Sequence, residues 1–228
     1  MTKPSLSGLR IVVSAGPTYE DLDPVRFLGN RSSGKMGFAI AAAAARRGAE
    51  TVLVAGPVQL PTPEGVQRRD VRSAEQLRDE VIAALPADVY VGAAAVADWT
   101  PRTVAAHKLK KADGVDTLTL ELVRTPDTLA EVAAHPRRPR LVVGFAAETN
   151  DVERHARGKL EKKRLDLIAA NRVGVAGSGF ESDDNALVVY GRDADGRGLQ
   201  RALGPASKAR ISDDLLDLVL EQLTAGTR

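Results

Sequence analysis

Five short apolar runs recur along this 228-residue chain, and segments with helical spacing separate them. Continuous apolar runs of this length are typical of strands that are buried on both faces of a parallel sheet. Strands that alternate with helices predict a Rossmann-like, doubly wound, mostly parallel α/β sheet. The predicted strands cover residues 9–15, 51–55, 88–95, 141–146 and 165–169, with a short one at 66–71, and the predicted helices cover 34–47, 73–85, 126–134, 152–164 and the C-terminal stretch from Ser207 or Ser212.

Two regions depart from this alternation. Residues 96–124 contain a lysine cluster and then a period-two pattern at 117–122, which predicts a flap with a half-exposed edge hairpin. Residues 185–190 and a glycine-containing turn at 193–198 predict an antiparallel margin of the sheet. Because no linker or repeat interrupts the chain, residues 1–228 are expected to form a single domain.

Composition limits the classes of function. The net charge is only +2, so the protein has no strong positive field to attract nucleic acid. Aromatic residues make up 4%, which leaves few side chains on which bases could stack. The absence of cysteine excludes disulfides and thiolate chemistry. No apolar run reaches membrane-spanning length, so the sequence predicts a cytoplasmic protein with no membrane or nucleic-acid partner.

The stretch at residues 26–38 combines three glycines, adjacent serines and basic side chains just before a helix. Glycines allow close backbone approach, and a helix N-terminus offers free N–H groups, so we expect a phosphate site there. A Walker A loop is a poor match, because Met36 occupies the Ser/Thr position that holds magnesium. A plain Gly/Ser turn with a solvated Lys35 is the alternative.

Further unusual residues follow the predicted strands, where an open α/β sheet binds its ligands. The small residues at 92–97 would let a flat base lie on bare backbone, although tight helix packing explains them equally well. Asp98 suits a ribose hydroxyl or magnesium, and Phe145 could stack on a base or belong to the core. Lys159 and Lys163 share a helix face and could meet one polyphosphate, unless that face is simply solvated. The three histidines have no metal spacing and are interpreted as structural or surface residues.

Taken together, these motifs resemble the phosphopantothenoylcysteine synthetase family, the bacterial CTP-dependent ligases of coenzyme A biosynthesis. The resemblance covers nearly the whole chain. It rests on Ala15–Thr18 (written AGPT), LDPVR at 22–26, NxSSGKMG at 30–37, AAVAD at 94–98, KxKK at 108–111, PD at 126–127, GFAAET at 144–149, and GF at 179–180 with Asn185.

The resemblance implies a two-step reaction. The carboxylate of 4′-phosphopantothenate attacks the α-phosphate of CTP, and the amine of cysteine then displaces CMP from the acyl-cytidylate. It implies a catalytic role for Asn30, whose amide could stabilise an oxyanion, and for Lys108, which would contact the nucleotide from the flap. It further implies nucleotide or phosphate contacts at Ser32, Ser33, Gly34, Lys35, Ala93, Ala94, Ala95, Asp98, Pro126, Asp127, Thr128, Leu129, Phe145, Lys159 and Lys163.

The family also implies Mg²⁺, with Asp98 as its candidate ligand, and no flavin in this chain. A homodimer is expected, as is fusion to or association with a phosphopantothenoylcysteine decarboxylase. Two other classes stay open from the residues alone. An NAD(P) reductase would need the glycine fingerprint that this sequence lacks, and a non-catalytic nucleotide sensor would bind CTP without turnover.

Overall fold

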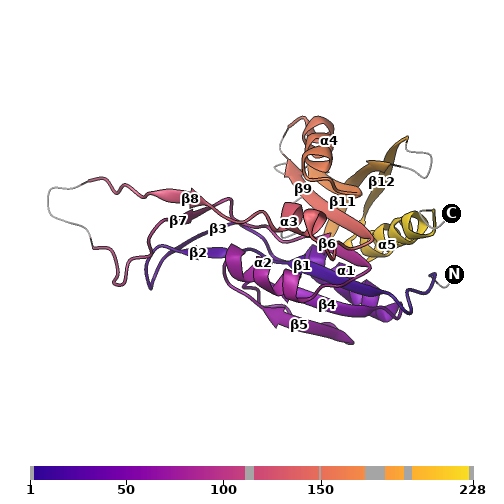
Figure 1. Ribbon diagram of the computed structural model, residues 1–228, viewed down its shortest axis with the longest axis horizontal. Coiled ribbons are helices and arrows are strands. Elements are labelled where there is room, and N and C mark those ends of the chain that lie inside the picture. Colours follow the sequence, from indigo (N-terminus) through magenta and orange to yellow (C-terminus); the bar gives the residue numbers. More distant parts are fainter. Residues whose placement is uncertain (1–2, 111–115, 149, 173–182, 193–196, 226–228) are drawn as a thin grey trace.

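The computed structural model describes residues 3–110, 116–148, 150–172, 183–192 and 197–225. An eight-stranded sheet forms its centre (Figure 1). In chain order the strands are β1 (Arg10–Ala15), β4 (Glu50–Ala55), β5 (Val66–Asp70), β6 (Val89–Gly92), β9 (Leu141–Glu148), β10 (Leu167–Arg172), β11 (Asp184–Arg192) and β12 (Gly198–Ser207).

The strand order is β12-β11-β10-β9-β6-β1-β4-β5. Every pairing from β10 to β5 is parallel, and β11 and β12 are antiparallel. The chain first moves outward from β1 to β4 and β5, then returns to β6 on the other side of β1. The order therefore reverses between β1 and β6, where open α/β sheets form their ligand crevice. The expected doubly wound sheet and its antiparallel margin are confirmed.

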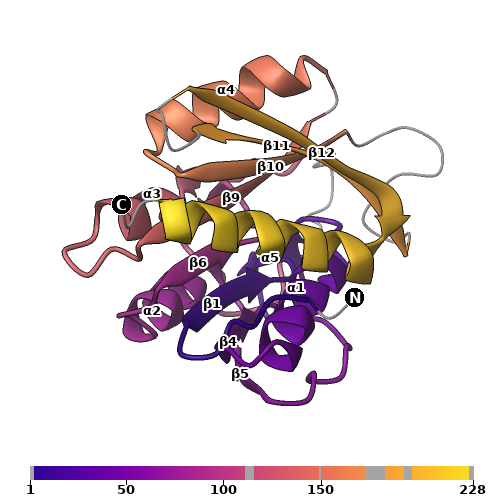
Figure 2. The same cartoon turned by 90° about the vertical axis from the view of Figure 1, so that its right-hand side faces the viewer.

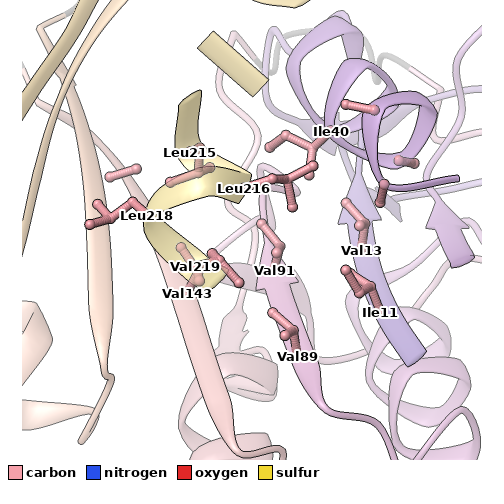
Figure 3. Packing of buried hydrophobic residues seen from close by; sticks show 14 of the residues in the cluster. Ile11, Val13, Ile40, Val89, Val91, Val143, Leu215, Leu216, Leu218 and Val219 are labelled. Carbon is pink, nitrogen blue, oxygen red and sulfur yellow. The ribbon is translucent and has the colours of Figure 1, made fainter. Parts of the chain in front are cut away.

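Helices cover both faces of the sheet. On one face α1 (Lys35–Arg46) and α5 (Lys208–Ala225) pack side by side (Figure 2). Leu215, Leu216 and Val219 of α5 lie between Ile40 of α1 and strand residues such as Val143 (Figure 3). On the other face lie α2 (Ala74–Ala83), α3 (Thr128–Ala134) and α4 (Val152–Lys162). The alternating strands therefore bury two separate cores, one under each helical layer.

Local signals explain several boundaries. Ser73 and Gln76 form the predicted capping box that starts α2. Gly48, with φ of 92°, follows α1 in the left-handed conformation that glycine adopts without strain. Asp127 is the N-cap of α3 and accepts from the N–H of Ala130, so that helix begins two residues later than predicted. Strand β6, which was predicted to cover residues 88–95, ends at Gly92.

An arm projects from the carboxyl side of the sheet (Figure 1). Its described residues are 19–29, 99–110 and 116–124, with the hairpins β2 (Tyr19–Asp21)–β3 (Phe27–Gly29) and β7 (Trp99–Pro101)–β8 (Leu122–Arg124). The predicted strand at 117–122 is wrong except at its last residue. Residues 116–120 are all exposed, so their alternating pattern faces no sheet or core.

The first hairpin of the arm was not among the predicted strands, because a proline and several charges interrupt its short apolar runs. Several quoted motif positions, namely Lys111, Thr149, Gly179, Phe180 and the turn at 193–196, lie outside the described residues. Within the described part of the chain, no helix combines the length and the apolar character needed to cross a membrane.

Candidate active site

A cavity of about 850 Å³ opens at the carboxyl ends of β1, β6 and β9, where the strand order reverses. The expected site residues converge on it from both faces of the sheet. Of the seventeen expected residues, Lys108 does not line this cavity. The other sixteen do: Asn30, Ser32, Ser33, Gly34, Lys35, Ala93, Ala94, Ala95, Asp98, Pro126, Asp127, Thr128, Leu129, Phe145, Lys159 and Lys163.

A buried hydroxyl pair lies in the cavity wall. Ser14 Oγ and Tyr90 Oη are 3.0 Å apart, and both residues are almost fully buried. Burial raises the pKa of Tyr90 to about 12 despite its hydrogen bond to Ser14. The phenol therefore stays protonated at neutral pH, and this wall presents neutral dipoles to a ligand.

The small residues after β6 are only partly available to a base. Ala95 donates its N–H to Gly16 and accepts from Thr18, and Ala93 donates to Ser14. Ala94 lies between them, outside every strand, and makes no backbone hydrogen bond within the described residues. The polar groups of Ala94 are therefore the best placed of the three for reading the edge of a base.

Asn30 follows β3 and is fixed by the same loop. Its Nδ2 donates to the carbonyl oxygens of Ala95 and Val96, at 3.1 and 3.0 Å. Two carbonyl acceptors define which end of the amide is nitrogen and occupy both of its hydrogens. An oxyanion would need one of those hydrogens, and the expected donor role of Asn30 stays a prediction. Its Oδ1 is the group left for a ligand.

The glycine–serine stretch enters α1 at the cavity. Gly34 is the N-cap in the left-handed region, with φ of 74° and no side-chain capping bond. A Cβ on Gly37 would lie 2.4 Å from the Cβ of Ala15, so this glycine lets α1 approach β1 closely. The first-turn N–H groups of a twelve-residue helix thus face the cavity without a side-chain cap, which favours an anion.

The α3–α4 side of the cavity is cationic. Lys159 and Lys162 of α4 line it, and Lys163 Nζ lies 2.9 Å from the carboxylate of Asp127. That ion pair ties the end of α4 to the N-cap of α3. Lys163 therefore also anchors Asp127, and the expectation that Lys159 and Lys163 meet one polyphosphate stays a prediction.

Asp98 is an exposed carboxylate on the cavity rim, just before β7. Among the described residues there is no group of three or more His, Cys, Asp or Glu that could hold a metal. Mg²⁺ commonly binds through one or two carboxylates together with substrate phosphates, and a single rim carboxylate fits that mode.

Lys108 lies on the arm, away from the cavity, although its neighbour Leu109 is firmly held. Asp23, which is 1% exposed, accepts from the Leu109 N–H at 3.0 Å, and Arg26 donates to the Leu109 carbonyl at 2.7 Å. Asp23 and Arg26 also form an ion pair at 2.6 Å. The guanidinium of Arg26 and the backbone donors hold the pKa of Asp23 well below its usual range.

Several cavity residues were not predicted. Asn185 belonged to a quoted motif without an assigned role, and Lys208 has no sequence signal, because a single lysine at a helix start is usually a surface residue. Lys208 is 6% exposed, and burial, followed by the charge of Lys35, lowers its pKa. Further unpredicted lining residues include Arg31, Arg124, Lys162 and Asn171.

Known proteins resemble this chain over most of its length. The Coenzyme A biosynthesis bifunctional protein CoaBC of Vibrio cholerae is 48% identical over 219 residues, 96% of this chain and 54% of that protein. The protein of the same name from Escherichia coli K12 is 53% identical over 192 residues, 83% of this chain and 47% of that protein. The chain thus spans about half the length of the curated relatives it matches.

A crystal structure of the C-terminal domain of CoaBC has a TM-score of 0.76 and 37% identity, covering 95% of this chain and 97% of that one. The family model described as "DNA/pantothenate metabolism flavoprotein C-terminal domain" matches residues 6–223. This chain therefore belongs to the family of DNA/pantothenate metabolism flavoprotein C-terminal domains.

Proposed function

We propose that this chain is a CTP-dependent ligase that joins 4′-phosphopantothenate to L-cysteine. The observation that carries the proposal is the single cavity at the reversal of the strand order, on which sixteen residues expected from the ligase resemblance converge. Membership of the family and the relatives' name, which refers to coenzyme A biosynthesis, support it.

The nucleotide lies across the carboxyl edge of the sheet. Its base rests on Ala93–Ala95, where Ala94 offers free backbone groups, and Phe145 gives it an aromatic neighbour. The triphosphate points to the α3–α4 side, where Lys159 and Lys162 offset its charge. Lys163 contributes by fixing Asp127 and with it the start of α3.

In the first step a carboxylate oxygen of 4′-phosphopantothenate forms a bond to the α-phosphorus of CTP, and pyrophosphate leaves with the electron pair of the broken P–O bond. Asp98 would hold Mg²⁺ beside the phosphates, and the metal would neutralise charge on them. The lysines of α4 hold the triphosphate in line with the incoming carboxylate.

In the second step the amine of cysteine forms the amide bond, and CMP leaves with the electrons of the acyl–oxygen bond. The amine nitrogen loses a proton to solvent. We assign to Asn30 Oδ1 the acceptor that orients this amine, since both amide hydrogens are already donated to the backbone. Lys108 would contact the nucleotide only if the arm moved it to the cavity of the same chain or to the cavity of a second copy.

The arm also suggests the assembly. All the large hydrophobic side chains exposed in the described part of the chain lie on it: Val25, Phe27, Trp99, Val104, Leu118 and Leu120. We propose that the arms of two copies pair to form a homodimer. By analogy with the longer relatives, a phosphopantothenoylcysteine decarboxylase is the proposed fused or associated partner. Because the reaction consumes CTP, we place it in the cytoplasm.

The direct test incubates the protein with CTP, Mg²⁺, 4′-phosphopantothenate and cysteine, and quantifies CMP, pyrophosphate and the amide product. The three products are expected in equal amounts. Without cysteine, pyrophosphate should be released while CMP stays bound as the acyl-cytidylate. If the complete mixture releases no CMP although CTP binds, the chain is a nucleotide sensor and the ligase proposal is wrong.

A further inference from the structure

Two threonine hydroxyls hold one residue of the loop at 93–98, which joins β6 to β7 at the mouth of the cavity. That residue, Ala97, is 8% exposed. Its N–H donates to Thr18 Oγ1 at 2.9 Å, and its carbonyl accepts from Thr125 Oγ1 at 2.6 Å. Both backbone polar groups of Ala97 are therefore bound by side chains that come from distant parts of the sequence.

Thr18 holds the loop from the body of the sheet. It follows β1 by three residues and is fully buried. Its own N–H donates to the Ala95 carbonyl at 3.3 Å, and Pro17 forms a parallel bridge with Ala95. The backbone thus aligns Thr18 with the loop, and the hydroxyl satisfies a buried N–H that would otherwise lack a partner.

Thr125 holds the same loop from the arm. Its hydroxyl donates to Ala97, and its N–H donates to the Asp98 carbonyl at 3.1 Å. The second hairpin of the arm starts directly after Asp98 and ends directly before Thr125. Thr125 therefore closes the base of that hairpin, and it joins the arm, the loop and the start of α3.

The threonine pair fixes the stretch between the two parts of the loop that face the cavity. Asn30 already fixes Ala95 and Val96 through their carbonyl oxygens. Within the described residues, no side-chain hydrogen bond or ion pair holds the Asp98 carboxylate, so the backbone sets where it lies. The separation between the backbone groups of Ala94 and the Asp98 carboxylate thus depends on how Ala97 is held.

We propose that Thr18 and Thr125 are positioning residues that set the selectivity of the site for CTP over UTP. They act through Ala97, which keeps Ala94 and Asp98 at one separation. Cytosine and uracil differ in the donors and acceptors along one edge, and a fixed backbone discriminates because a wrong base leaves polar groups unpaired. A loop free to shift weakens the correct bonds and relieves the wrong ones. The inference rests on the proposed function, which places the base on this loop.

Calorimetric titrations with CTP and with UTP, each without the other substrates, test the pair. Thr125→Val removes the hydroxyl and keeps the branched shape. It should weaken CTP by roughly tenfold and UTP by less, so that the ratio of the two affinities narrows. Thr18→Val should act in the same direction. Thr125→Ser keeps the hydroxyl and should bind both nucleotides within about twofold of the wild type.

Thr51→Val is the matched control. Thr51 is 2% exposed, and its hydroxyl donates to the Ala49 carbonyl at 3.2 Å near the start of β4, at the amino edge of the sheet. This variant should lower the melting temperature, as Thr18→Val does, but leave both nucleotide affinities unchanged. The comparison separates a positioning role from a loss of stability.

The inference is overturned if Thr125→Val binds CTP as the wild type does, or weakens CTP and UTP by the same factor. It is equally overturned if Thr125→Ser fails to restore the ratio. Should Thr18→Val not fold, Thr125→Val decides, since Thr125 is only partly buried. A wild type that binds neither nucleotide would overturn the proposed function and this inference with it, whereas unchanged variants of a wild type that binds CTP would overturn the inference alone.

Discussion

Asn30 donates from Nδ2 to the carbonyl oxygen of Ala95 over 3.1 Å, and thereby ties the end of the first arm hairpin to the loop after β6. A second bond to Val96 fixes the amide plane. Asn30, to which we assign the acceptor for the incoming amine, therefore also holds the loop that we propose to carry the base. Its substitution should separate the two half-reactions.

Asn30→Ala is expected to release pyrophosphate and accumulate the acyl-cytidylate, while CMP release slows by roughly tenfold or more because the amine loses its acceptor. Rapid-quench chromatography of the nucleotides measures both. Asn30→Asp keeps an oxygen but turns a carboxylate toward two carbonyl oxygens, so it should not restore the rate. Normal CMP release by Asn30→Ala would exclude a role for Oδ1.

Asp23→Asn should lower the melting temperature at pH 7, because the buried carboxylate accepts from Arg26 and from the Leu109 N–H. The pKa of Asp23 is depressed in the folded state, so its stabilisation is present above the unfolded pKa of about 4 and is lost as the pH falls toward the folded value. The difference in melting temperature between wild type and variant should therefore narrow below about pH 4.

The same substitution has a local readout. The Leu109 amide should exchange with deuterium faster in Asp23→Asn, because its acceptor is weakened. Asp79, an exposed carboxylate paired with Arg78, provides the control. Asp79→Asn should change neither the exchange at Leu109 nor, appreciably, the melting temperature.

Gly37→Ala should destabilise the protein by about 1–3 kcal/mol, because the added methyl group would press on Ala15 and lift α1 from β1. Gly158 in α4 is the matched control, since a Cβ there meets no atom within 4 Å. Gly158→Ala should stabilise by about 0.5–1 kcal/mol through helix propensity. Chemical denaturation of both variants measures the free energies of unfolding, and equal signs for the two would contradict the packing argument.

Leu118→Asp should dissociate the proposed dimer, because it places a charge among the exposed apolar side chains of the arm, where Leu118 is 60% exposed. Sedimentation velocity over a range of concentrations reports the change. Ala202→Asp, on the exposed side of the far edge strand β12, should leave the assembly unaltered. A wild type that sediments as a monomer at all concentrations would contradict this assembly.

Much of the fold followed from local patterns. The capping box at Ser73 and Gln76 started α2 as predicted, and the buried apolar runs became β1, β4, β6, β9 and β10. The period-two pattern at 117–122 failed, because alternation describes a strand only when a neighbouring strand or core gives it two different faces. The first hairpin of the arm was missed because its short strands show no clear alternation. They are held by pairing across a proline turn, which includes the stacked rings of Tyr19 and Phe27.

Local sequence patterns were enough to predict the α/β class and the residues at the carboxyl ends of the strands, because apolar periodicity and glycine-rich turns act over a few neighbouring positions. The partner of each of these residues depends on the folded arrangement. It turned the Asn30 hydrogens toward backbone carbonyls, paired Lys163 with Asp127, and buried Lys208 and Asn185 in the wall opposite α4. These features depend on contacts between residues far apart in the chain, and the local spacing of residues does not predict such contacts.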